Sequence, residues 1–112
     1  MRLKALRAAV NRFAGERKWG KYHTPKNLAM SVAIEAAELM EIFQWKRPQE
    51  KLTPAERAHL EEEMADVFLY LVRLADRFDV DLIDAAEAKM KKNAVKYPAD
   101  ARRSDLARRS RR

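Results

Sequence analysis

Two pairs of carboxylates recur at the same spacing in separate segments of the chain. Glu35 and Glu38 are three residues apart, as are Glu63 and Asp66, and 24 residues separate the two pairs. On a helix, where successive residues turn by about 100°, each pair lies on or beside an apolar stripe. Burying ionised carboxylates is costly unless they are paired or bind a metal. The four acids therefore predict a functional site between two helices.

A divalent cation is the partner that this acid set predicts. Inward Lys or Arg residues are scarce on these helices, and Arg73 is expected on another face. Ligands that are all oxygen favour Mg²⁺, with Mn²⁺ as a possible substitute, over zinc. A di-iron site would need Glu-x-x-His pairs, and neither His23 nor His59 follows a Glu by three residues. The alternative is that each acid lies at the edge of the apolar stripe with its carboxylate in solvent, which two matching pairs disfavour.

Residues that favour helices dominate the rest of the chain. There are two Gly and four Pro, and no run has the alternation of a strand. Thr24-Pro25 and Thr53-Pro54 are typical helix starts, and Glu56 completes a capping box. We expect an all-α bundle of four helices, over 2–18, 25–44, 54–78 and 81–96. The third is apolar on nearly every face, which predicts self-association through the second and third helices.

The net charge of +7 is uneven along the chain. Residues 101–112 hold six Arg and one Asp, which gives +5 and leaves +2 for residues 1–100. We therefore expect one domain over 1–100 and a basic tail over 101–112. Such a tail can bind nucleic-acid phosphates weakly, although a solvated terminus is the more ordinary interpretation. The apolar stretches are too short for a membrane span or a signal peptide, so a cytoplasmic protein is expected.

The segments around the acids resemble the all-α nucleoside triphosphate pyrophosphohydrolases, the MazG-like superfamily, and in particular their dCTP pyrophosphatase branch. Besides the four acids, the resemblance is carried by Phe13-Ala-Gly-Glu-Arg-Lys-Trp19, Tyr22-His23-Thr-Pro-Lys-Asn27, Glu35-Ala-Ala-Glu38-Leu-Met-Glu41-Ile-Phe-Gln-Trp45, Glu62-Glu63-Met-Ala-Asp66-Val-Phe-Leu-Tyr70 and Lys89-Met-Lys-Lys-Asn93-Ala-Val-Lys96-Tyr97-Pro98. It implies Mg²⁺-dependent hydrolysis of a (deoxy)nucleoside triphosphate to the monophosphate and pyrophosphate. The implied substrate is dCTP or a modified dCTP, for cleaning the nucleotide pool, and the implied assembly is a homodimer or homotetramer.

The resemblance also assigns roles by position. Metal binding and catalysis would fall to Glu35, Glu38, Glu63 and Asp66, and one acid of the second helix could also orient the attacking water. The substrate-binding set would be Trp19 and Trp45 on either side of the base, Tyr70 and His23 beside it, and Lys89, Asn93 and Lys96 facing the phosphates. The last three share one helical stripe, at i, i+4 and i+7. His59 is expected at the surface, and Glu41 at the surface or behind the acid set.

One departure and two alternatives remain open. Val10 stands where animal dCTP pyrophosphatases carry a histidine that touches the base, which weakens the expectation of cytosine specificity. One alternative is a non-catalytic helical interaction module whose basic tail binds nucleic acid. The other is hydrolysis of a different phosphoanhydride, such as a coenzyme or alarmone, because tryptophans stack on any base.

Overall fold

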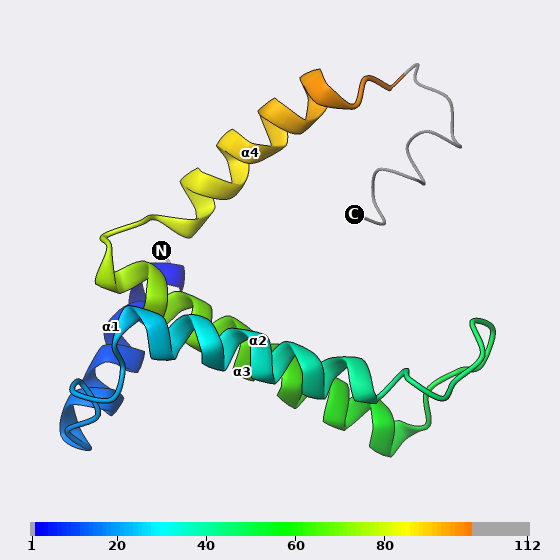
Figure 1. The fold of residues 1–112 in the computed structure, drawn as a ribbon, viewed down its shortest axis with the longest axis horizontal. Coiled ribbons are helices and arrows are strands. Elements are labelled where there is room, and N and C mark those ends of the chain that lie inside the picture. Colours follow the sequence, from blue (N-terminus) through cyan, green and yellow to red (C-terminus); the bar gives the residue numbers. More distant parts are fainter. Residues whose placement is uncertain (1, 100–112) are drawn as a thin grey trace. The chain divides into compact units, whose positions relative to one another are not determined.

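The computed structural model describes residues 2–99, which contain four helices and no strand. These are α1 (Arg2–Glu16), α2 (Pro25–Glu41), α3 (Pro54–Arg77) and α4 (Leu82–Lys96) (Figure 1). The predicted all-α class with four helices is confirmed. The chain divides into two units after Asp79, so that α1 to α3 form one unit and α4 belongs to the other. The predicted basic tail at 101–112 lies outside the described residues.

The two helices that carry the acids begin where the sequence predicts. Thr24 caps α2 by accepting a hydrogen bond from the backbone N–H of Asn27 at 3.2 Å. Thr53 caps α3 through a reciprocal pair, in which Glu56 N donates to Thr53 Oγ1 at 3.1 Å and Thr53 N donates to Glu56 Oε1 at 2.8 Å. Because these caps set where each helix starts, they also set the direction in which the acids point.

The first unit is built around α3. α2 runs along α3, and α1 also packs against α3 (Figure 1). The buried hydrophobic residues in the described part are few: Ala14, Leu28, Val72 and Ala75. Several large apolar side chains of α2 and α3 remain exposed, namely Met30, Ile34, Met40, Met64, Phe68 and Leu71. An uncovered apolar surface of this kind supports the predicted self-association, which stays a prediction.

The helix ends differ from the predictions by one to three residues. α2 ends at Glu41 rather than at position 44, because the chain tightens into turns in which Phe43 N donates to Met40 O and Gln44 N to Glu41 O. Trp45 therefore lies in the connection to α3, as expected, four residues beyond the end of α2. α1 ends at Glu16 and α3 at Arg77, one or two residues earlier than expected. No helix in the described range is long and apolar enough to cross a membrane.

Candidate functional site: an acidic cluster beside an aromatic pocket

Three of the four predicted acids meet between α2 and α3. Glu35, Glu63 and Asp66 each present a carboxylate oxygen, and these three atoms lie within 4.8 Å of one another. The Glu63 side chain is only 12% exposed. The Oε2 atoms of Glu35 and Glu63 are buried and have no hydrogen-bond partner within residues 2–99. Buried acceptors are seldom left unpaired, so these two oxygens mark a place for a ligand.

Crowding of like charges changes the ionisation of this cluster. Burial raises the pKa of Glu35 to about 7, assisted by a hydrogen bond with Glu38 and by the negative charges of Glu38, Asp66 and Glu63. Glu38 is exposed and is not one of the three converging acids, but this hydrogen bond places it directly beside them. A carboxyl with a pKa near 7 gives up its proton readily when a cation arrives.

The donor set of the cluster fits a hard divalent cation. Carboxylate oxygens are the ligands that Mg²⁺ and Mn²⁺ prefer, and the two unpaired buried oxygens are the atoms that such an ion would engage. Glu35, Glu63 and Asp66 would hold the ion, with Glu38 next to it. The cluster thus has the composition of a divalent-metal site, which agrees with the prediction from the sequence.

His59 makes a contact with the acidic cluster that the sequence analysis did not predict. Its side chain is 55% exposed, as expected of a surface residue, but its Nε2 lies 3.1 Å from Glu63 Oε1. This contact occupies Oε1 of Glu63, while Oε2 is buried and has no partner among the described residues. The i, i+4 spacing of the two residues on α3 was the available signal.

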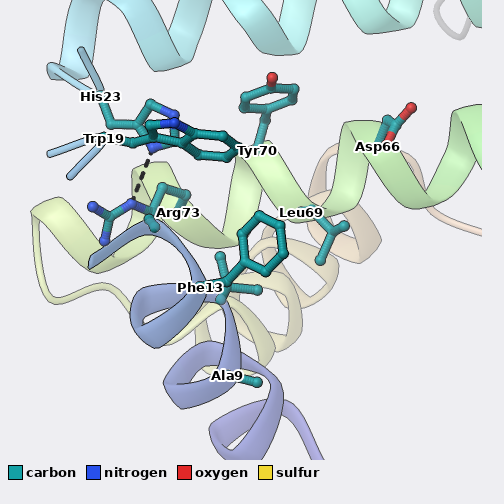
Figure 2. Close-up of a pocket in the computed structure, with 10 residues that line it drawn as sticks. Ala9, Phe13, Trp19, His23, Asp66, Leu69, Tyr70 and Arg73 are labelled. Carbon is teal, nitrogen blue, oxygen red and sulfur yellow. Dashed lines mark hydrogen bonds between the residues drawn. The ribbon is translucent and has the colours of Figure 1, made fainter. Parts of the chain in front are cut away.

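A pocket of about 450 Å³ lies next to the acidic cluster. Asp66 lines this pocket and also belongs to the cluster, so one side chain joins the two. Figure 2 shows Trp19, His23 and Tyr70, three of the predicted substrate-binding residues, gathered in one part of its wall. The whole lining consists of Ala9, Val10, Phe13, Ala14, Trp19, His23, Asp66, Leu69, Tyr70 and Arg73.

The turn after α1 brings Trp19 to this pocket. Lys18 adopts a positive φ of 56°, and Trp19 N donates to the carbonyl of Ala14 at 3.0 Å, so the chain folds back over the end of α1. The Trp19 ring then lies 5.5 Å from the Phe13 ring in an edge-on arrangement and 5.6 Å from the ring of His23. Aromatic walls held in this way suit a flat ring between them.

The prediction that Arg73 lies on another face of α3, away from the site, is wrong. Arg73 lines the pocket, and its side chain is 11% exposed. Asp66, Tyr70 and Arg73 are spaced i, i+4 and i+7, which is one helical stripe. The sequence interpretation took Glu63 as its reference, and from there Arg73 falls on the far edge of the stripe. Counting from Asp66 would have found it.

The other predicted residues lie outside the part of the site that the first unit forms. Trp45 is 86% exposed and does not line the pocket. Lys89, Asn93 and Lys96 belong to α4, in the second unit, and their predicted contact with phosphates remains a prediction. Glu41, expected at the surface or behind the acids, is exposed and is not among the converging carboxylates.

Comparison with known proteins agrees with this geometry. The model of the MazG-like family matches residues 30–106, a range that includes all four acids. The chain belongs to the MazG-like family. The resemblance inferred from the acid spacing and its flanking segments is therefore confirmed.

Individual relatives narrow the comparison within the MazG-like family. The chain is 44% identical over 106 residues to dCTP pyrophosphatase 1 of Homo sapiens, which covers 91% of this chain and 62% of that protein. It is 43% identical over 100 residues to dCTP pyrophosphatase 1 of Bos taurus, and this match covers 86% of this chain and 59% of that protein. This chain thus spans about three fifths of the curated relatives it matches.

A solved structure shares the fold. A pyrophosphatase from Archaeoglobus fulgidus DSM 4304 superposes with a TM-score of 0.77 at 42% sequence identity. The match covers 88% of this chain and 94% of that one. At this identity and coverage, the all-α arrangement described above is that of a known pyrophosphatase.

Proposed function

We propose that this MazG-like chain is a metal-dependent nucleoside triphosphate pyrophosphohydrolase. The observation that carries the proposal is the junction at Asp66, where a cluster of carboxylates with two unpaired buried oxygens adjoins an aromatic pocket. A nucleotide has the matching parts, a flat base and a chain of anionic phosphates that binds cations. The likeness to dCTP pyrophosphatase 1 of two mammals supports dCTP, or a modified dCTP, as the substrate.

The reaction is hydrolysis at the α-phosphate. The water oxygen bonds to the α-phosphorus, the bond from that phosphorus to the oxygen bridging the β-phosphate breaks, and monophosphate and pyrophosphate leave. Mg²⁺, for which Mn²⁺ can substitute, would supply charge neutralisation and lower the pKa of its bound water. Glu35, Glu63 and Asp66 hold the ion in this proposal. Glu38, exposed and hydrogen-bonded to Glu35, orients the attacking water and accepts its proton.

The pocket accounts for the base. Stacking on aromatic rings is worth about 1–3 kcal/mol per base. Trp19, His23 and Tyr70 supply the wall observed in the first unit. Trp45 is proposed to stack on the opposite face of the base, and Lys89, Asn93 and Lys96 to contact the phosphates, since a cation–amide–cation stripe complements their charge.

Assembly and location complete the proposal. The exposed apolar side chains on α2 and α3 support a homodimer or homotetramer formed through these helices. A role in clearing unwanted nucleotides from the pool would place the protein in the cytoplasm. The Arg-rich tail is proposed to bind nucleic acid only weakly, because exposed phosphate contacts are screened by salt.

Release of pyrophosphate tests the function directly. Purified protein is offered canonical and 5-modified deoxynucleoside triphosphates, with Mg²⁺ or with EDTA. Mg²⁺-dependent release that is strongest for cytosine deoxynucleotides supports the reaction and the substrate, and release spread over other bases supports the reaction alone. No release, together with a salt-sensitive DNA complex that disappears when 101–112 are deleted, would instead identify a non-catalytic interaction module.

A further inference from the structure

A chain of polar contacts lies behind the aromatic wall of the pocket. Arg73 Nε donates to His23 Nδ1 at 3.3 Å, the contact drawn as a dashed line in Figure 2. Arg73 Nη1 donates to Asn11 Oδ1 at 2.8 Å and lies 3.8 Å from Asp76 Oδ2. Asp76 in turn is paired with Arg7 of α1. Each of these five residues has a partner on another element, so the Arg73 guanidinium has little freedom to turn away from His23.

The contact with Arg73 determines which nitrogen of His23 carries the proton. A guanidinium has only donors, so the imidazole nitrogen facing it must accept. A neutral imidazole has one N–H, and with Nδ1 accepting, the hydrogen must sit on Nε2. Burial lowers the pKa of His23, and the positive charges of Arg73 and Arg77 lower it further, which favours the neutral ring that the contact with Arg73 requires.

His23 itself belongs to the pocket. Its ring lies 5.6 Å from that of Trp19 and 6.3 Å from that of Tyr70, and it lines the cavity together with them. Arg73 occupies Nδ1, so the group that His23 can offer to a bound molecule is Nε2–H. A ligand that leaves a polar group of an aromatic wall without a hydrogen bond loses affinity. The ligand is therefore held in the orientation in which it pairs with that group.

We infer that Arg73 is a positioning residue that locks His23 as an Nε2–H donor, so that the pocket selects a base presenting a hydrogen-bond acceptor at this place. Cytosine carries two adjacent acceptors, O2 and N3, and therefore meets the requirement. This inference rests on the proposed function for the identity of the ligand. The tautomer of His23 does not depend on the proposed function, and it can be measured without any substrate.

Nitrogen NMR of histidine-labelled protein tests the tautomer. The chain has two histidines, so the spectrum is simple, and His59→Gln assigns the signals. At neutral pH we expect His23 to show a protonated Nε2 and an unprotonated Nδ1. Arg73→Met, which keeps the bulk of the side chain but removes its donors, should convert this signal to a mixture of tautomers. A wild-type His23 protonated on Nδ1, or an unchanged Nε2–H tautomer in Arg73→Met, would overturn the inference.

Arg77→Met is the matched control. It removes the same charge from the same helix, and Arg77 influences His23 through charge without a hydrogen bond to it among the described residues. We expect Arg77→Met to keep the wild-type tautomer. Should Arg73→Met fail to fold, Asn11→Ala weakens the support of the guanidinium without touching the imidazole, and should shift the tautomer in the same direction.

Steady-state kinetics connect the tautomer to binding. Arg73→Met should raise the KM for dCTP about fivefold to tenfold, as loss of one hydrogen bond does, while kcat stays within about twofold. Arg77→Met should change neither constant. An unchanged KM in an Arg73→Met protein that releases pyrophosphate normally would refute the link to substrate. Absence of Mg²⁺-dependent release from wild type would refute the proposed function instead, and the NMR result would still decide the tautomer.

Discussion

The side of α3 that carries the site has an acidic end and a basic end, and the charged groups at the two ends differ in whether they have partners. At one end, Glu63 and Asp66 face Glu35, and two carboxylate oxygens are buried without a partner inside the described chain. At the other end, about two and three turns further on, Arg73 and Asp76 lie among partners from α1 and the loop before α2. Within residues 2–99 the charges of the second end are paired with one another, whereas the first end keeps two carboxylate oxygens without a partner.

This difference indicates that the acidic end binds a ligand, whereas the basic end keeps the pocket wall in a fixed arrangement. Buried charges that lack partners destabilise a fold, and a protein tolerates them where a ligand supplies the missing charge. Buried polar groups that are fully paired make their surroundings rigid. The acidic end thus has the properties of a cation site, whereas the basic end holds the wall of the pocket in place. Changes at the two ends should therefore have different consequences.

The largest effect is expected from Glu63→Gln. This change removes a charge and a ligand oxygen from the cluster. We expect metal affinity and activity to fall more than a hundredfold, because losing a residue that only supports a metal ligand already costs about 10–100-fold. Pyrophosphate release and Mg²⁺ titration measure it. Glu62→Gln, the same change at the exposed neighbouring position, should leave both close to wild type. Equal activity in the two variants would refute the assignment of the cluster.

Divalent cations should stabilise the protein through the same end. A ligand that binds only the folded state at a hundred times its Kd adds about 2.7 kcal/mol. For a domain of this size that corresponds to a rise in Tm of about 10 °C or more, which thermal denaturation with Mg²⁺ and with EDTA would show. The rise should vanish in Glu63→Gln and persist in Arg7→Met. A rise of equal size in Glu63→Gln would place the cation elsewhere.

Removing one partner at the basic end should destabilise the fold without affecting the metal. Arg7→Met leaves Asp76 without its main partner from α1, and we expect the free energy of unfolding to fall. Arg12→Met, an exposed position on the same helix, serves as the control. Urea denaturation measures both. A variant as stable as wild type would show that this pairing is not needed to hold α1 on α3.

Acid should act on the two ends in opposite directions when no metal is present. The pKa of Glu35 is raised from 4.5 to about 7, so the folded protein binds the extra proton between these values, and stability from this group grows as the pH falls through that range. Burial alone would raise the pKa of Asp76, but hydrogen bonds from Arg7 and Asn11 lower it below its usual 3.8. Stability from Asp76 is therefore present above pH 3.8 and is lost as the pH falls further.

Two variants separate these contributions. In metal-free protein, Glu35→Gln should remove the gain in stability on acidification from pH 7 to 4.5, and Asp76→Asn should reduce the loss at more acidic pH. Urea denaturation across this pH range gives both slopes. If Glu35→Gln left the upper slope unchanged, the crowding of carboxylates around Glu35 would not be present in solution.

The acidic end could be predicted from the sequence, and the basic end could not. Acid pairs at i and i+3 beside apolar stripes are a local pattern, and the caps at Thr24 and Thr53 fix the helix registers, so the meeting of α2 and α3 follows. The contact of Arg73 with His23 and Asn11 joins α3 to residues 50 and 62 positions away in sequence. No helical periodicity encodes such a contact, since it depends on how α1 and the loop at Trp19 fold back.

The smallest effect is expected from a comparison of the two tryptophans. Trp45→Ala should change the free energy of unfolding by less than about 0.5 kcal/mol, because the side chain is 86% exposed. Trp19→Ala should cost more, because its ring packs against Phe13 and His23. Both variants should raise the KM for dCTP if the two rings enclose the base. A KM change in Trp19→Ala alone would place the whole of base recognition on the pocket wall that Arg73 supports.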